Sequence, residues 1–149
     1  MHLNNITIDQ SRYPTYDYYP FNLPVFQKTK RITFNAPVTF FAGENGSGKS
    51  TLLQALSRSC GIHIWQEAET ALSPRSQLAL LELLTETSAK DHAQFIIATH
   101  SPILLACPHA LIYSFDYSPV RQILYEETEH YKIYRDFLEN RLNYLKQPA

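Results

Sequence analysis

Residues 43–51 read Gly43-Glu44-Asn45-Gly46-Ser47-Gly48-Lys49-Ser50-Thr51. This segment, called the phosphate loop below, fits the pattern G-x-x-x-x-G-K-[ST], which arises by chance in well under about 1% of chains of this length at average composition. It also holds three of the four glycines among the 149 residues. Because glycine lets the backbone curl until successive N–H groups converge on an anion, the segment predicts a cradle for phosphate.

The neighbours of the phosphate loop strengthen this prediction. Before it, Val38–Ala42 is apolar enough for a buried central strand, and after it Lys49–Ser59 has the leucine spacing of a helix. A helix that begins at the loop adds the positive end of its dipole at the same point. In such a loop Lys49 reaches the β- and γ-phosphates, the Ser50 hydroxyl binds Mg²⁺, and Thr51 contacts the α-phosphate. The alternative is a glycine-rich turn between strand and helix with an incidental lysine.

Alternating short strands and helices indicate an α/β fold with a largely parallel sheet flanked by helices. Besides the segments around the phosphate loop, the pattern predicts strands at Asn5–Asp9, Arg31–Asn35, Ile62–Trp65, Gln94–Thr99, Ala110–Phe115 and Gln122–Glu126. It predicts helices from Pro74 to about Lys90 and from Glu129 to Lys146, the second with its apolar residues on one face. Arg12–Pro24, dense in tyrosine and proline, is expected to be an ordered aromatic loop.

Length and composition fit one domain over residues 1–149 and exclude several classes of protein. Hydrophobic residues make up 44% and charged residues 18%, so a disordered chain is not expected. Thirteen Lys and Arg balance fourteen Asp and Glu. The short basic cluster at residues 28–31 is expected to be solvated at the start of a strand, and no nucleic-acid partner is predicted.

The sequence shows neither a membrane span nor a secretory signal. The apolar region Phe95–Tyr113 is interrupted by prolines and histidines and falls short of the roughly 20 apolar residues of a membrane helix. The first residues lack the basic and apolar parts of a secretory signal. Cys60 and Cys107 have neither metal-ligand spacing nor companion ligands. Together these features predict a reduced, cytoplasmic protein without a membrane partner.

Several segments of the chain resemble a family of small bacterial AAA/ABC-type ATPases, which are stand-alone ATP-binding proteins with a P-loop NTPase fold. The resemblance covers most of the chain and rests on the phosphate loop, Tyr19–Pro24, Val38–Phe41, Ala71–Pro74, Phe95–Ala106 and Tyr125–Tyr131. The phosphate loop together with Ala98-Thr99-His100-Ser101-Pro102 is its most specific part. The resemblance implies a P-loop NTPase fold of ABC-ATPase type, with ATP and Mg²⁺ as ligands.

Two roles outside the phosphate loop follow from the resemblance. His100 matches the histidine that reaches the γ-phosphate and the attacking water in these ATPases, whereas the alternative is a histidine that caps a strand end. An aromatic residue ahead of the loop stacks on adenine in ABC-type enzymes. Tyr19 or Phe21 could take that place, and the alternative for both is packing within the aromatic loop.

The catalytic stretch departs from the family pattern of Asp-Glu-Pro followed by Leu-Ser-Pro. Counting back from Leu72-Ser73-Pro74 puts Glu67 on the catalytic glutamate that polarises water and Gln66 on the metal-side aspartate. A glutamine accepts a hydrogen bond from a Mg²⁺-bound water but lacks the charge that a hard cation favours, so weaker metal affinity is expected. The alternative for Glu67 and Glu69 is a solvated loop before a helix, where acids also suit the helix dipole.

A longer family segment is missing between about Ser59 and Gln66. The family carries there a glutamine loop, a helical subdomain and a signature of Leu-Ser-x-Gly-Glu type, and no such signature occurs in this sequence. In ABC-type enzymes the signature of one subunit closes over the ATP held by the other. A head-to-tail homodimer, the partner that the resemblance implies, would therefore lack its usual closure, and the chain is expected to be a shortened ATPase domain.

The residues leave three functions open. The first is an ATPase with ATP and Mg²⁺ at the phosphate loop, Glu67 as base and His100 at the γ-phosphate, working by positioning and electrostatics. The second is a nucleotide-binding module or remnant with negligible hydrolysis, which the missing signature and Gln66 favour. The third is a small P-loop kinase, which fits the length but shows no arginine-rich lid and leaves the segment around His100 unexplained.

Overall fold

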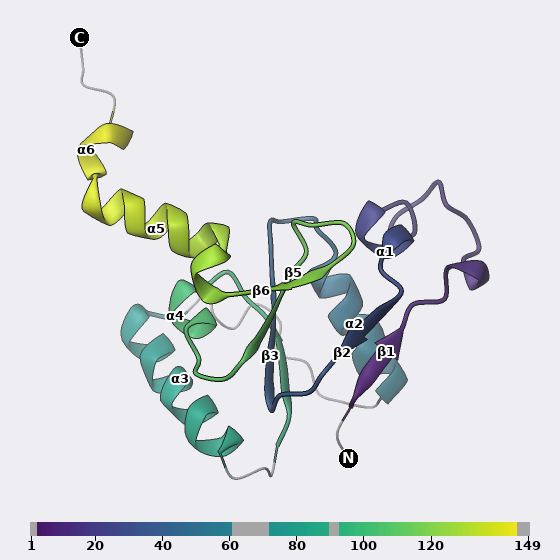
Figure 1. Cartoon of the computed structure of the whole chain (residues 1–149), viewed down its shortest axis with the longest axis horizontal. Coiled ribbons are helices and arrows are strands. Elements are labelled where there is room, and N and C mark those ends of the chain that lie inside the picture. Colours follow the sequence, from purple (N-terminus) through teal and green to yellow (C-terminus); the bar gives the residue numbers. More distant parts are fainter. Residues whose placement is uncertain (1–2, 61–71, 90–92, 146–149) are drawn as a thin grey trace.

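A four-stranded sheet lies at the centre of the computed structural model, which describes residues 3–60, 72–89 and 93–145 (Figure 1). Its strand order is β4–β3–β5–β6, formed by Phe95–Ala98, Val38–Ala42, Leu111–Ser114 and Arg121–Ile123. β3 pairs in parallel with both β4 and β5, whereas β6 pairs antiparallel with β5. The expected parallel sheet is thus found in β4, β3 and β5. β6 differs because the short connection at residues 115–120 suits an antiparallel pair, while a parallel pair needs a longer crossover.

Helices cover both faces of this sheet. Helix α2 (Lys49–Cys60) lies on one face, and α3 (Pro74–Ser88) and α4 (Pro102–Leu105) lie on the other (Figure 1). Ser73 caps α3 by accepting a hydrogen bond from the Ser76 amide at 3.2 Å, with Pro74 at the first helical position, as the sequence predicts. The α/β layering therefore agrees with the sequence-based expectation.

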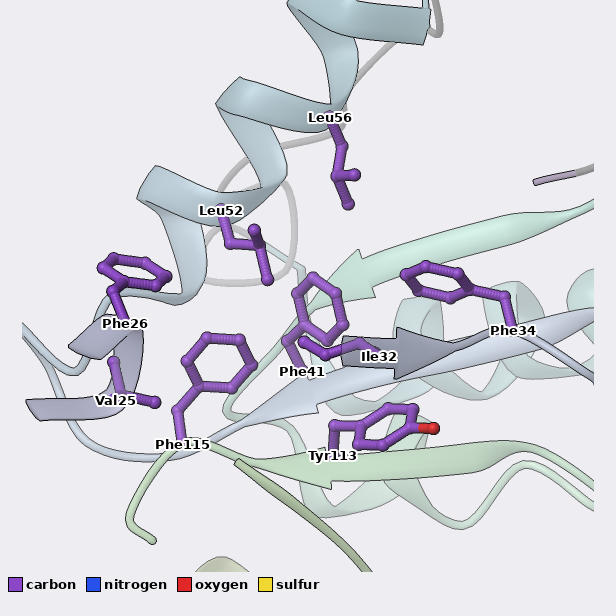
Figure 2. Close-up of a cluster of buried hydrophobic side chains, with 9 residues drawn as sticks. All are labelled: Val25, Phe26, Ile32, Phe34, Phe41, Leu52, Leu56, Tyr113 and Phe115. Atoms are coloured by element: carbon purple, nitrogen blue, oxygen red, sulfur yellow. The ribbon is translucent and has the colours of Figure 1, made fainter. Parts of the chain in front are cut away.

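Alternating side chains of β3 fill two separate apolar clusters. Phe41 enters the cluster under α2, while Phe40 enters the cluster under α3 and α4, and both rings are fully buried. Figure 2 shows the first cluster, in which Leu52 and Leu56 of α2 lie over Phe41 and Phe115. Burial of each such side chain contributes about 1.5–3 kcal/mol. Packing on both faces thus fixes the end of β3 from which the phosphate loop starts.

A small antiparallel ribbon lies beside the α2 face. It pairs β1 (Asn5–Thr7) with β2 (Arg31–Thr33), and β1 is followed by the 3-10 turn η1 (Gln10–Arg12). The aromatic segment between η1 and β2 contains a helix that the sequence does not predict, α1 (Pro24–Lys28), which begins on a proline. Val25 and Phe26 of α1 are buried in the cluster under α2, so tertiary packing selects this short helix.

The C-terminal part departs from the prediction of one continuous helix. After the 3-10 turn η2 (Tyr125–Glu127), α5 spans Glu129–Glu139 and α6 spans Arg141–Tyr144. Asn140 interrupts them with φ −129° and ψ 37°, and its side-chain amide donates to Asp136 Oδ1 at 2.8 Å. α5 and α6 extend away from the sheet (Figure 1), and most large apolar residues within 129–145 are exposed, with Leu138 76% exposed.

Two predicted strands and the expected lack of a membrane-spanning helix can also be compared with the structure. The strand predicted at Ile62–Trp65 lies outside the described residues. The segment predicted as a strand at Gln122–Glu126 is shorter, because it ends at Ile123 and turns into η2. In the described ranges, none of the helices combines the length and the apolar character that crossing a membrane requires.

Candidate functional site

The phosphate loop joins the carboxyl end of β3 to the first turn of α2. Gly43, Gly46 and Gly48 all have positive φ, at 140°, 80° and 103°. At Gly43 an added Cβ would lie 2.9 Å from Asp116 Oδ1, and at Gly48 it would lie 3.0 Å from the ring of Phe26. Two of the glycines are therefore required by both backbone conformation and close approach, as the clustering in the sequence predicts.

Lys49 is buried inside the loop that precedes it, with 6% of the residue exposed. Its Nζ donates to the carbonyls of Gly43 at 2.6 Å and Glu44 at 2.8 Å, and approaches Ser47 Oγ at 3.5 Å. These carbonyls hold a full positive charge at the N-terminus of α2, where the helix dipole is also positive. The backbone of residues 44–46, which precedes Lys49 in the loop, is exposed.

Three hydroxyl groups line the start of α2. Ser50 is exposed, and Thr51 is half-buried. The Thr51 hydroxyl is hydrogen-bonded to the phenol of Tyr19, which comes from the aromatic segment and is 62% exposed. Phe21, the other aromatic residue considered for adenine, packs its ring on Tyr13 with 4.8 Å between centroids. The two aromatic candidates thus differ, since Tyr19 lies at the loop and Phe21 belongs to the packed aromatic segment.

His100 follows the carboxyl end of β4, the strand next to β3. The Thr99 amide donates to the Phe41 carbonyl at 3.1 Å and extends the β3–β4 pairing up to this histidine. The pKa of His100 is lowered by burial first and then by the positive charge of Lys49 and by His130, while Glu44 and Asp116 oppose this shift. His100 and Lys49 therefore share one electrostatic environment, although they lie 51 positions apart in the sequence.

Asp116 fixes the start of the phosphate loop. Its Oδ1 accepts a hydrogen bond from the Glu44 amide at 2.8 Å, and its Oδ2 accepts from Ser114 Oγ at 3.3 Å. The Asp116 amide in turn donates to Ser114 Oγ at 3.2 Å. A carboxylate that follows β5 thus holds the amide of the loop's second residue in place.

A comparison with models of protein families supports what this geometry indicates. The family model described as AAA domain matches residues 21–96, which is more than half of the 149 residues. The chain belongs to the AAA domain family. No curated protein and no solved structure matched in the other two comparisons.

AAA domains are generally ATPases that use ATP and Mg²⁺, and the residues present fit both groups. The curled loop amides, the buried Lys49 and the N-terminus of α2 offer positive charge and N–H donors to an anion. The exposed hydroxyl of Ser50 is an oxygen ligand of the kind that Mg²⁺ prefers. Membership of the family thus supports a nucleotide-binding, ATPase-like function for this AAA domain.

The structure of this AAA domain brings some of the sequence-predicted residues together and leaves others aside. The phosphate loop and His100 lie in one environment. Glu67 and Gln66, predicted as the catalytic base and as a metal-side residue, lie outside the described residues, as does Glu69. Their roles stay predictions.

Two residues near the site were missed by sequence reasoning. Asp116 had a usable signal, because it follows a predicted strand and the carboxyl ends of parallel strands meet at one edge of the sheet. His130 lies in the segment Tyr125–Tyr131, which carried part of the resemblance but had no role. Its partner, His100, is 30 residues away, and no local pattern predicts that contact.

His100 is also one of the residues that line an open groove of about 1000 Å³. Apolar side chains of α3, α4 and α5 line it, among them Leu78, Leu81, Ile103 and Leu138. No residue of the phosphate loop belongs to its lining.

Proposed function

We propose that this AAA domain binds ATP with Mg²⁺ at the phosphate loop and hydrolyses the γ-phosphate in the manner of ABC-type ATPases. The observation that carries the proposal is the buried ammonium of Lys49, held within 2.6 and 2.8 Å of the Gly43 and Glu44 carbonyls at the start of α2. This ammonium adds its positive charge to the positive end of the α2 dipole, and a phosphate bound at the loop is attracted by both.

Each part of the loop has a separate task in this proposal. The loop amides and the α2 dipole bind the phosphate oxygens, and Lys49 turns from the loop carbonyls to the β- and γ-phosphates. Ser50 Oγ and the amide oxygen of Gln66, the latter through a bound water, hold the metal. When bound, Mg²⁺ neutralises charge on the phosphate oxygens. Tyr19, exposed beside Thr51, is the proposed contact for adenine.

Glu67 and His100 serve the hydrolytic step. Glu67 accepts the proton of a water whose oxygen forms a bond to the γ-phosphorus, and the bond from that phosphorus to the bridging oxygen breaks, leaving ADP and phosphate. His100 donates a hydrogen bond to a γ-phosphate oxygen as charge shifts during this exchange. Its position beyond β4, within the electrostatic reach of Lys49, supports that role.

The second candidate is a nucleotide-binding module with negligible hydrolysis. Gln66 favours it, because a neutral amide in place of a carboxylate weakens the hold on a hard cation. The absence of a signature segment in the sequence favours it as well. Under either function the proposed partner is a second copy of the chain, which the exposed apolar face of α5 and α6 supports.

Turnover of ATP by four proteins separates the two functions. We expect the wild-type protein to release phosphate, Glu67→Gln to lose turnover while keeping ATP binding, and Gln66→Asp to raise turnover by strengthening the metal site. Lys49→Ala should lose binding of a fluorescent ATP analogue. Tight ATP binding without turnover in all three proteins that retain Lys49 would establish the nucleotide-binding module. Unchanged ATP binding by Lys49→Ala would show that the nucleotide does not bind at the phosphate loop.

A further inference from the structure

The rings of His100 and His130 are in direct contact. His100 Nδ1 lies 2.9 Å from His130 Nε2, with ring centroids 5.0 Å apart and planes inclined by 64°. His100 comes from the end of β4 and His130 from the first turn of α5. At this distance one nitrogen donates and the other accepts, so the protonation of one ring constrains that of the other.

His130 is held by a tightly bonded helix start. The Leu124 amide donates to Glu127 Oε2 at 2.7 Å. Thr128, which is 2% exposed, donates its hydroxyl to the Tyr125 carbonyl at 2.7 Å and accepts from the Tyr131 amide at 3.3 Å. The rings of Tyr125 and Tyr131 also pack together at 4.7 Å. These contacts fix the backbone on both sides of His130, so its imidazole approaches His100 from a defined direction.

His100 is held as firmly from its own side. The Ser101 amide donates to Thr99 Oγ1 at 2.9 Å, and Ser101 Oγ accepts from the Leu104 amide at 3.1 Å. The same hydroxyl donates to Gln77 Oε1 at 2.6 Å, which ties α3 to the segment that carries His100. With both backbones fixed, the contact between the two rings is a built feature of the fold.

We infer that His130 is a positioning residue for His100. In this arrangement His130 Nε2–H donates to His100 Nδ1, and the hydrogen of the neutral His100 ring is therefore on Nε2, directed to a γ-phosphate oxygen. The opposite tautomer would present a lone pair to that oxygen and repel it. The inference rests on the proposed function, because it gives a role to the histidine next to the reacting phosphate.

The charges around the pair make this choice of tautomer matter. The charges of Lys49 in α2, Glu44 in the phosphate loop and Asp116 after β5 act on His100, together with that of His130 in α5. Burial, Lys49 and His130 lower the pKa of His100 and outweigh the two carboxylates. The ring is accordingly neutral near neutral pH. A neutral imidazole donates from only one nitrogen, and a hydrogen bond in which His130 donates to Nδ1 favours the tautomer with its hydrogen on Nε2.

Kinetics of the full chain test the inference. We expect His130→Leu to lower kcat by about 10- to 100-fold with little change in KM for ATP, as for other residues that orient a reacting group. His130→Gln should restore most of this loss, because its Nε2–H can donate at the place of the imidazole Nε2. Lys132→Gln, an exposed change on the same helix, is the control and should keep wild-type kcat. Wild-type kcat in His130→Leu would overturn the inference.

Nitrogen-15 spectra of the histidine rings test the contact without turnover. We expect His100 to be the Nε2–H tautomer in the wild type, with and without a non-hydrolysable ATP analogue and Mg²⁺, and a mixture of tautomers in His130→Leu. Equal His100 tautomers in both proteins would overturn the inference, even where the variant loses activity. If the wild type binds ATP without turnover, the ATPase proposal fails alone, and these spectra still decide the role of His130.

Discussion

Gly48 lies where the phosphate loop passes over the buried ring of Phe26. An added Cβ would lie 3.0 Å from Phe26 Cζ and 3.2 Å from Leu23 Cδ1, whereas at Gly46 it would meet nothing within 4 Å. Both glycines have positive φ, so both substitutions with alanine carry backbone strain of about 1–3 kcal/mol. We expect Gly48→Ala to lose a further 1–3 kcal/mol or so of unfolding free energy by overpacking. Urea unfolding of the two variants measures the difference, and equal losses would show that Phe26 moves aside.

The lowered pKa of His100 makes the free energy of unfolding depend on pH. Burial first, then Lys49 and His130, lower its pKa in the folded state, so the unfolded chain binds more protons between that pKa and the ordinary value of about 6.5. The free energy of unfolding must therefore fall as pH drops from about 6.5 through this window, and this contribution is fully present above it. We expect His100→Gln to flatten that part of the curve. Urea unfolding at several pH values tests this, and parallel curves for the two proteins would contradict it.

Individual residues of the site differ in how far the sequence could predict them. The phosphate loop is local, since its glycines, Lys49 and Ser50 are consecutive or nearly so. Asp116 acts on the loop from 72 positions away through the Glu44 amide, and the contact between His100 and His130 depends on where α5 begins. Such pairings follow from the arrangement of strands and helices, which no local pattern specifies.

At the scale of elements, β3 contains a polar group in an apolar setting. Thr39 is fully buried at the centre of the sheet, and among the described residues its Oγ1 is the buried side-chain oxygen or nitrogen that has no hydrogen-bond partner. Valine has nearly the same shape and suits a strand, so Thr39→Val removes the cost of an unsatisfied hydroxyl. We expect the free energy of unfolding to rise by about 1–2 kcal/mol.

Urea unfolding of Thr39→Val measures this gain. Thr33→Val is a suitable control, because Thr33 is exposed in β2 and its hydroxyl is hydrogen-bonded to the Tyr113 hydroxyl at 3.1 Å. That variant should gain nothing or lose stability. A loss in Thr39→Val would mean that the hydroxyl is satisfied in solution.

The elements that packing decides are those that the sequence predicted least well. The strands β3, β4 and β5 were predictable from short apolar runs in the sequence, because a strand buried on both faces needs apolar residues on both. α1 has five residues and no helical periodicity of its own, and only the burial of Val25 and Phe26 selects it. The amphipathic pattern of the C-terminal segment predicts a helix, and α5 confirms it. The break at Asn140 and the exposure of the apolar residues depend on side-chain contacts and on the surroundings.

For the whole molecule, binding at the phosphate loop must raise the stability of the fold. At 100 times the dissociation constant a ligand contributes about 2.7 kcal/mol, which raises the Tm of a domain of this size by about 5–10 °C. We expect this rise in Tm for the wild type with ATP and Mg²⁺. We expect none for Lys49→Ala, because the phosphate oxygens of ATP would have no ammonium to bind. A wild-type Tm that ATP does not move would contradict nucleotide binding at the loop.

Removal of the metal separates the contribution of Ser50 from that of the loop. With ATP and EDTA the wild-type shift should be smaller, because the phosphates keep more of their mutual repulsion and the Ser50 hydroxyl has no cation to bind. Ser50→Ala should show the same small shift with Mg²⁺ and with EDTA. Ser59→Ala, the same substitution near the other end of α2, should respond like the wild type. If Ser50→Ala kept the full difference between Mg²⁺ and EDTA, the metal would have to be bound by other residues, and the weak ligand expected at Gln66 would then need a stronger companion.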